Sequence, residues 1–374
     1  MSPDEPPLDR SQDERDGGSD AVPPRPDLGV LVGYHSPQVD VEVRLNTNES
    51  PLPPPPAWRA ALQAGLGDID FNRYPDRDAT ALRDALAALH GTDRSRIFCA
   101  NGSNEVLQSL LLAYGGSQRT VALFEPTYQL HRHIAATTAT AVASGWRLPD
   151  HRLDLAVVDR VLEEARPVIT FLCSPNNPTG RAEPPEVIAH VLERAPGLVV
   201  VDEAYGQFAP HSGLDLWRDG RGPARLVVVR TFSKTWSMAA CRLGYLVADP
   251  AVVTACEAVA LPYHLDAVTQ LAGRLALEHV DAMEARVAAI TEERGRLAAA
   301  LSELDVETWP SDANFILFRP RGGAAAALWR DLVARSVLVR DCSTWPGLDD
   351  CLRVTVGSAH GNDRFVAALR ASLA

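Results

Sequence analysis

The stretch LVVVRTFSK occupies residues 226–234 and contains the only lysine of this 374-residue chain. Its apolar half, residues 226–229, is typical of a strand buried within a parallel sheet. Lys234 follows the carboxyl end of this strand, which is where open α/β sheets bind their ligands. The other 35 of the 36 basic residues are arginine, which cannot condense with a carbonyl, whereas a lysine amine forms Schiff bases. The stretch therefore predicts an α/β fold with a reactive amine at the edge of its sheet.

Composition and charge argue against several classes of protein. The formal charge of −12 and the lack of a basic run argue against binding to nucleic acid or to an anionic membrane surface. The sequence has no apolar stretch of about 18 residues and its start is acidic, so we expect a cytoplasmic protein. Six cysteines lie singly and are expected to be reduced and mostly buried. His131 and His133 could share one face of a strand, but with no third ligand in view no metal site is expected.

The distribution of apolar residues predicts a tail, an arm and two domains. Residues 1–28 are rich in proline and charge and cannot repay the entropy lost on folding, so they are expected to be disordered. Residues 29–56 end in a proline run and are predicted to form an extended arm. Residues 57–270 alternate between strands and helices, which predicts a large domain with a mainly parallel sheet, and residues 271–374 are predicted to contain a smaller α/β domain. The clearest elements are a helix at 80–90 and strands at 96–100, 121–124, 168–173, 198–202, 226–230, 314–317 and 352–356.

Two further strands end in polar residues that suit a ligand. The turn SPNNPTG at residues 174–180 follows one strand, and its prolines and glycine leave Asn177 free to direct its amide at a ligand. Asp202 closes the apolar run of the next strand, and a buried aspartate needs a partner, which a cationic ring nitrogen would supply. Tyr205, three residues later, can reach the same ligand.

A phosphate site is predicted beside these residues. Asn101-Gly102-Ser103-Asn104 opens a helix, whose free N–H groups and dipole suit an anion. Thr231, Ser233 and Arg242 add hydroxyl groups and a guanidinium. An amine, an acid, a hydroxyl, an amide and a phosphate cup together match one cofactor, pyridoxal 5′-phosphate.

The residues also carry a family resemblance. From about Leu28 to the C-terminus the sequence resembles the fold-type I aminotransferases, and among them it is most similar to the histidinol-phosphate aminotransferases. The resemblance implies a mainly parallel, seven-stranded-type sheet between helices in the large domain and an arm that packs against the small domain or a partner subunit. The matching stretches are residues 46–49, 73–76, 102–105, 126–128, 174–180, 202–205, 233–234, 242–244 and 351–357.

The resemblance implies a role for each matched residue. Lys234 would bind the cofactor covalently and move a proton, Asp202 would hold the ring nitrogen, and Tyr205 and Asn177 would hydrogen-bond the ring oxygen. Tyr128 would stack on the ring. The phosphate would be held by Gly102, Ser103, Asn104, Thr231, Ser233, Arg242 and, from the neighbouring subunit of a homodimer, Tyr74. The substrate would be held by Tyr34, Asn48, Arg340 and Arg353.

The implied reaction moves an amino group from L-histidinol phosphate to 2-oxoglutarate, giving imidazole acetol phosphate and L-glutamate in histidine biosynthesis. Three alternatives stay open. One is a threonine-phosphate-type decarboxylase, and another is an aromatic amino acid aminotransferase, which Trp236 and Trp345 weakly favour. The third, a regulator with an aminotransferase-like domain, needs an upstream helix-turn-helix module, for which residues before Leu28 leave no room.

Overall fold

The computed structural model describes residues 22, 25, 28, 37–217, 220 and 222–374. The predicted disorder of residues 1–28 concerns a segment of which only three residues are described, and Tyr34 lies outside the described residues. All six cysteines are free thiols and five are buried, as expected. In the part of the chain that is described, no helix is both long enough and apolar enough to cross a membrane.

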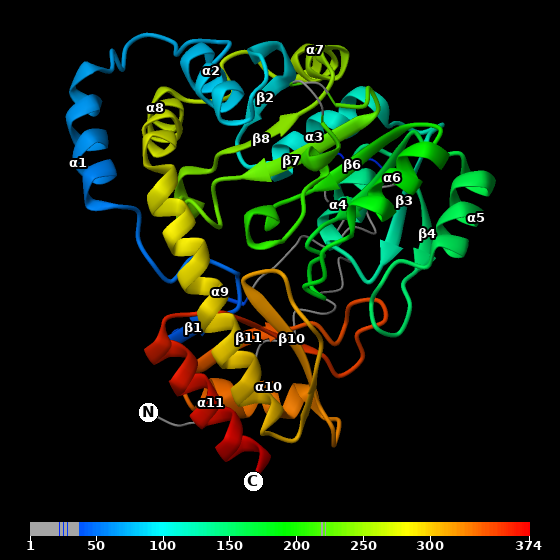
Figure 1. The fold of residues 1–374 in the computed structure, drawn as a ribbon, viewed down its shortest axis with the longest axis vertical. Helices are drawn as coiled ribbons and strands as arrows, with labels where there is room; N and C mark the ends of the chain where they lie inside the picture. The colour runs from blue at the N-terminus through cyan, green and yellow to red at the C-terminus, as the bar shows by residue number, and fades with distance from the viewer. Residues whose placement is uncertain (1–21, 23–24, 26–27, 29–36, 218–219, 221) are drawn as a thin grey trace.

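A seven-stranded sheet forms the centre of the larger part of the molecule (Figure 1). Its order is β2-β8-β7-β6-β5-β3-β4, and every strand runs parallel except β8, so the predicted mainly parallel sheet is confirmed. The strands span Ile97–Ala100 (β2), Thr120–Glu125 (β3), Ala141–Trp146 (β4), Ile169–Cys173 (β5), Leu198–Asp202 (β6), Leu226–Thr231 (β7) and Gly244–Val247 (β8).

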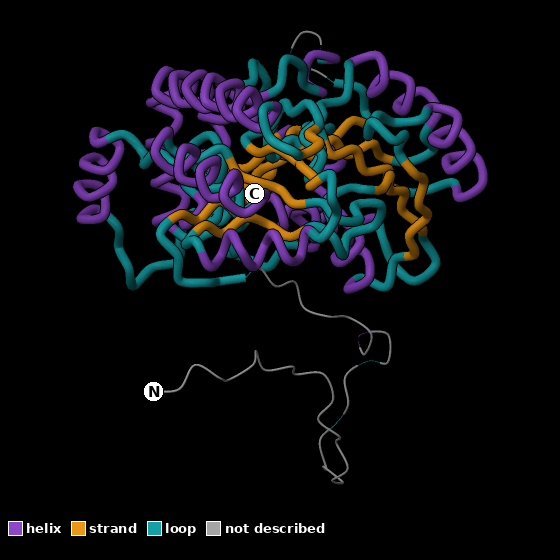
Figure 2. Tube along the Cα trace, turned by 90° about the horizontal axis from the view of Figure 1, so that it is seen from below, coloured by secondary structure: helices purple, strands orange, loops and turns teal. Residues whose placement is uncertain are grey.

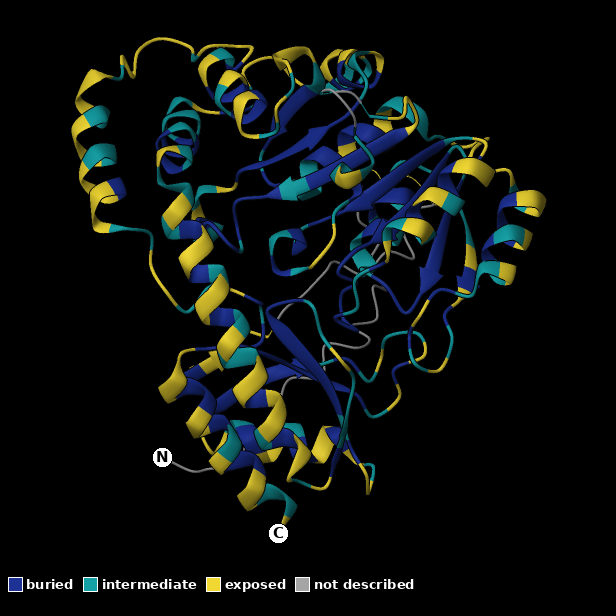
Figure 3. Cartoon of the chain, viewed as in Figure 1, coloured by how far each residue is buried: buried dark blue, intermediate teal, exposed yellow. Residues whose placement is uncertain are grey.

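Helices cover both faces of this sheet, and the side chains of each strand alternate between the two faces. In β6, Leu198 and Val200 pack with one group of helices, and Val199 and Val201 pack with the other. The strands consequently lie buried between helical layers (Figures 2 and 3). The first group contains α3 (Ser103–Tyr114), α4 (Gln129–Thr137) and α7 (Pro250–Val259), and the second contains α5 (Leu155–Ala165) and α6 (Pro185–Arg194).

A second sheet, of five strands, contains the N-terminal arm. Its order is β1-β11-β12-β10-β9, and β1 pairs in parallel with β11 through Val43 and Val337. These strands are β1 (Val43–Leu45), β9 (Val306–Thr308), β10 (Phe315–Pro320), β11 (Val337–Asp341) and β12 (Leu352–Thr355). Helix α9 (Val280–Ser302) runs from the larger part to this sheet, which also packs with α10 (Ala325–Ala334) and α11 (Ala359–Leu373).

The predicted domain limits stay predictions. The limit between residues 270 and 271 falls within α8 (Ala267–Ala276), which packs in one cluster with α1 (Pro56–Gly65) and α2 (Thr80–Leu89).

One local prediction is wrong. His131 and His133 do not lie on a strand but on α4. The alternation of His131 and His133 suggested a strand, whereas Leu130 and Ile134, four residues apart, have the helical spacing that decides the structure.

Candidate active site

A cavity of about 400 Å³ lies at the carboxyl ends of β5, β6 and β7, where the arm and the five-stranded sheet meet the larger sheet. The sheet edge predicted from Lys234 is therefore the edge that carries the cavity. The predicted residues that line it are Asn48, Ser103, Asn104, Tyr128, Asn177, Asp202, Tyr205, Thr231, Ser233, Lys234, Arg242 and Arg353.

Lys234 presents its amine to the cavity from the loop after β7. Its Nζ donates a hydrogen bond to the backbone oxygen of Thr47 at 2.9 Å. Burial, and next the guanidinium of Arg353, lower the pKa of Lys234 to about 7, although the carboxylate of Glu49 opposes the shift. Because a neutral amine is the nucleophilic form, Lys234 can attack a carbonyl near neutral pH.

Asp202 is buried at the end of β6, and its partner was missed by the sequence analysis. His131 Nε2 lies 3.0 Å from Asp202 Oδ2, while Asp202 Oδ1 accepts a hydrogen bond from the backbone N–H of Ala204 at 3.1 Å. The His131 ring is fully buried and stacks on Phe171 with centroids 4.6 Å apart. The carboxylate is thus held in place at the wall of the cavity. The only signal in the sequence was the need of a buried aspartate for partners, which does not say where they come from.

Tyr205 lies beside Lys234 and is held by the arm. Asn48 Nδ2 donates to the Tyr205 hydroxyl at 2.9 Å, and Thr355 Oγ1 donates to Asn48 Oδ1 at 3.0 Å. Burial raises the pKa of Tyr205 to about 12, so the phenol keeps its proton at neutral pH. Its hydroxyl accepts from Asn48 and can donate to a ligand.

Asn177 connects the 174–180 turn to the smaller sheet. Its side-chain oxygen accepts from Arg353 Nη1 at 2.5 Å, and Arg353 Nη2 donates to the backbone oxygen of Asn46 at 2.8 Å. Arg353 therefore contacts the turn and the arm from one guanidinium.

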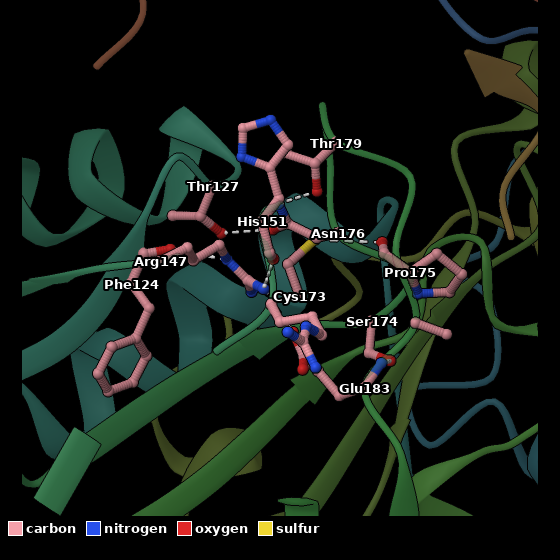
Figure 4. Close-up of polar contacts among 12 residues, drawn as sticks. Phe124, Thr127, Arg147, His151, Cys173, Ser174, Pro175, Asn176, Thr179 and Glu183 are labelled. Carbon is pink, nitrogen blue, oxygen red and sulfur yellow. Dashed lines mark hydrogen bonds and ion pairs between the residues drawn. The ribbon is translucent and has the colours of Figure 1, made fainter. Parts of the chain in front are cut away.

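Buried polar contacts hold the 174–180 turn in place (Figure 4). Asn176 donates to the backbone oxygen of Pro126 at 3.0 Å and accepts from Thr127 Oγ1 at 3.0 Å. Glu183, whose backbone N–H donates to Ser174 Oγ at 2.8 Å, forms an ion pair with Arg147 at 2.6 Å, and both charged side chains are almost completely buried. These contacts fix the turn that presents Asn177.

The predicted phosphate cup is assembled at the N-terminus of α3. Gly102 has a φ of +83°, and a Cβ there would lie 2.6 Å from Arg242 Nη2, so only glycine lets the guanidinium approach. Thr231 Oγ1 donates to Ser233 Oγ at 3.0 Å, and Arg242 Nη1 lies 3.4 Å from the same Ser233 oxygen. Hydroxyl groups, a guanidinium and free backbone N–H groups therefore converge, which suits an anion.

Tyr128 borders this cup. Its hydroxyl donates to Asn104 Oδ1 at 3.1 Å, and its ring meets His131 edge-on with centroids 5.3 Å apart. The position next to His131 and the cavity agrees with a side chain that can cover one face of a planar ligand.

Three predicted residues that the structure describes lie outside the cavity lining: Gly102, which borders the cup beside Arg242, Tyr74 and Arg340. Tyr74 is 80% exposed and stacks on Tyr263, with centroids 4.5 Å apart. Arg340 is buried, sits opposite Arg353 in the β11–β12 ladder and lies 5.5 Å from the centroid of the Trp345 ring.

Trp236 belongs to the core rather than to the site. It is buried and stacks on Phe232 with centroids 5.3 Å apart. Within the residues the structure describes, no group of three or more His, Cys, Asp or Glu side chains could hold a metal ion.

Comparisons with known proteins agree with this geometry. Residues 40–369 match the family model of the class I and II aminotransferases. The chain is 46% identical to the histidinol-phosphate aminotransferase of Frankia casuarinae over 369 residues, which cover 95% of this chain and 91% of that protein. It is 44% identical to that of Streptomyces avermitilis, with 94% and 97% covered. The crystal structure of histidinol-phosphate aminotransferase from Sinorhizobium meliloti in complex with pyridoxal 5′-phosphate superposes with a TM-score of 0.83, at 22% identity and with 93% and 97% covered, so the fold is shared.

Proposed function

The chain belongs to the class I and II aminotransferases, and we propose that it uses pyridoxal 5′-phosphate to transfer the amino group of L-histidinol phosphate to 2-oxoglutarate. The products are imidazole acetol phosphate and L-glutamate, and the reaction belongs to histidine biosynthesis. One observation carries the proposal: a single cavity gathers the amine of Lys234, the buried carboxylate of Asp202 and the cup around Arg242. The substrate is inferred from the 43–46% identical relatives that carry its name.

The residues present fit this cofactor group by group. The cup, in which Gly102 lets the Arg242 guanidinium come close to the backbone, suits the phosphate of the cofactor. The buried carboxylate of Asp202 suits the protonated ring nitrogen of the cofactor. Tyr205 and Asn177 suit its ring oxygen. When bound, the cofactor supplies a carbonyl that condenses with amines and a ring that accepts electrons from the substrate carbon.

The protein supplies the proton transfers and the orientation. Lys234 Nζ takes the proton from the carbon that carries the substrate amine, a role that its lowered pKa favours. Asp202, fixed by His131, provides a negative charge that keeps a ring nitrogen protonated. Because Tyr205 stays protonated, it donates a hydrogen bond rather than adding a negative charge.

Arginine side chains provide the anion site for both substrates. Arg353 reaches the cavity from β12, and Arg340 lies beside it in the ladder. Guanidinium groups bind phosphate and carboxylate bidentately, so the same site accepts histidinol phosphate and the acidic co-substrate. Asn48 orients Tyr205 on the same side, and Tyr34 is proposed from the family resemblance alone.

The active enzyme is proposed to be a homodimer in which Tyr74 completes the phosphate site of the second copy. Tyr74 stacks on Tyr263, and Phe71 and Leu261, which are close to these two residues in the sequence, are 73% and 77% exposed; exposed apolar side chains of this kind suit an interface. Mixing inactive Tyr74→Ala and Lys234→Ala variants should restore partial activity as subunits exchange, since a mixed dimer contains one intact site. Full activity of a demonstrated monomer would refute the proposal.

The substrate is tested by following the cofactor spectrum in single half-reactions. Histidinol phosphate should convert the enzyme fastest, and 2-oxoglutarate should reverse the change. A faster reaction with phenylalanine would favour the aromatic aminotransferase, and release of CO₂ from threonine phosphate would favour the decarboxylase. Borohydride reduction should label one peptide, the one that contains Lys234. A cytoplasmic location stays a prediction.

A further inference from the structure

Glu49 lies in an irregular stretch of the arm that is held by hydrogen bonds on both sides. Before it, the Asn48 backbone N–H donates to Thr355 Oγ1 at 3.0 Å and the Asn48 carbonyl accepts from Asn314 Nδ2 at 3.1 Å. After it, Ser50 Oγ accepts from Ser237 Oγ at 2.8 Å. Asn48 adopts the left-handed region with a φ of +56°. The position of Glu49 at the cavity is therefore fixed before any substrate arrives.

The arm contacts two charged side chains and then contributes a third. The Asn46 carbonyl binds Arg353, and the Thr47 carbonyl binds the Lys234 amine. Glu49 follows two residues later and also lines the cavity. Along the arm the cavity thus presents a cation, the reacting amine and then an anion.

Glu49 is the carboxylate of the cavity lining that has no ion-pair partner among the described residues. Only one other acidic residue, Asp202, belongs to the described lining, and it is buried against His131. Glu49 is exposed and forms no ion pair with any residue that the structure describes. Its negative charge is close enough to Lys234 to act on that amine.

We propose that Glu49 is a specificity-determining residue that binds the basic ring of the substrate. The inference rests on the proposed function. Histidinol phosphate has its phosphate at one end, the reacting amine in the middle and an imidazole at the other end. This order matches Arg353, Lys234 and Glu49, so the imidazole N–H donates to the Glu49 carboxylate as the phosphate occupies the arginine site.

The Glu49 carboxylate has the opposite effect on the acidic co-substrate, which it repels. With the α-carboxylate of glutamate at Arg353, the distal carboxylate points toward Glu49, and like charges repel. Glu49 therefore favours the imidazole substrate over the acidic one, and its removal should affect the two half-reactions in opposite directions.

The experiment compares Glu49→Gln with the unmodified holoenzyme in single half-reactions. The probes are L-histidinol phosphate, L-phenylalaninol phosphate, whose ring is neutral, and L-glutamate. Loss of a hydrogen bond to a charged group should lower kcat/KM for histidinol phosphate by about 10- to 100-fold, mostly through KM. The values for phenylalaninol phosphate should stay within about threefold, and those for glutamate should stay unchanged or rise. Glu49→Asp, which keeps the carboxylate, should retain more of the histidinol phosphate activity than Glu49→Gln does.

Matched controls separate a lost contact from a damaged fold. Glu164→Gln removes an exposed carboxylate from α5 and should leave all three reactions unchanged. Equal losses for histidinol phosphate and phenylalaninol phosphate, or unchanged kinetics of Glu49→Gln, would overturn the role of Glu49 alone. An unmodified enzyme that does not react with histidinol phosphate would overturn the proposed function as well, so the two failures are distinguishable.

Discussion

The pKa of Lys234 gives a quantitative prediction about cofactor capture by the cofactor-free protein. With a pKa of about 7, the neutral fraction of the amine rises from about 9% at pH 6 to about 91% at pH 8. The rate of condensation with pyridoxal 5′-phosphate should therefore rise about tenfold over this range and then level off. A lysine with its ordinary pKa of 10.5 would instead gain about tenfold per pH unit until pH 10.

Two substitutions should move this profile in opposite directions. Arg353→Met removes a cation that lowers the pKa of Lys234, so the profile should shift to higher pH. Glu49→Gln removes the carboxylate that opposes the shift, so the profile should move to lower pH. The titration of the cofactor itself is the same in all variants. Opposite shifts of the pH profile in these two variants would therefore identify Lys234 as the titrating group.

The assay is stopped-flow absorbance after mixing cofactor-free protein with cofactor across pH 5.5 to about 10. A rate that keeps rising about tenfold per unit above pH 8 would refute the lowered pKa. A second readout is stability without cofactor. Because the folded-state pKa lies below the unfolded value, the unfolded chain binds more protons between pH 7 and 10.5, and the fold gains stability as pH rises through this window. Lys234→Met should remove that gain.

Three further predictions concern single side chains. Lys234→Arg keeps a cation but cannot condense with a carbonyl, so steady-state assays with excess cofactor should detect no turnover. His131→Phe removes the hydrogen bond to Asp202, so kcat should fall by about tenfold with little change in KM, and an unchanged kcat would show that the carboxylate needs no support. Arg147→Met leaves Glu183 buried without its ion-pair partner, so urea titration should show a loss of about 3–5 kcal/mol in the free energy of unfolding, and a loss below about 1 kcal/mol would contradict this.

Strands β3, β5, β6 and β7 could be predicted from sequence because each is a short apolar run with a polar end, whereas the interior strand β8 was not predicted. The limits of β6, Leu198–Asp202, were predicted at both ends for this reason. Strands β1 and β4 could not be predicted in the same way. β1 has only three residues and is defined by pairing with β11, almost 300 residues later. β4 forms an edge of the sheet, where half-exposed residues give no continuous apolar run.

Site residues that directly follow a predicted strand could be placed from the sequence, whereas contacts between residues far apart in the sequence could not. Lys234, Asp202 and Asn177 follow apolar strands directly, so their place at the sheet edge follows from the strands themselves. His131 lies 71 residues before Asp202 and comes from a helix whose spacing says nothing about that contact. The contact of Arg353 with Asn177 spans 176 residues and likewise exists only in the folded chain.

The two sheets divide the chemistry of the site between them. Lys234, Asp202 and Arg242, which the proposal assigns to the cofactor, come from the larger sheet and its loops. Arg353 belongs to β12, and the arm that carries Glu49 continues directly from β1, so the residues assigned to substrate choice belong to the smaller sheet. β1 is hydrogen-bonded into that sheet, so both charges are presented by the smaller sheet and its arm, while Thr47 and Ser50 hold the arm against Lys234 and Ser237 of the larger part. Substitutions on the arm and β12 can therefore alter which amine is accepted while the groups that perform the proton transfer stay in place.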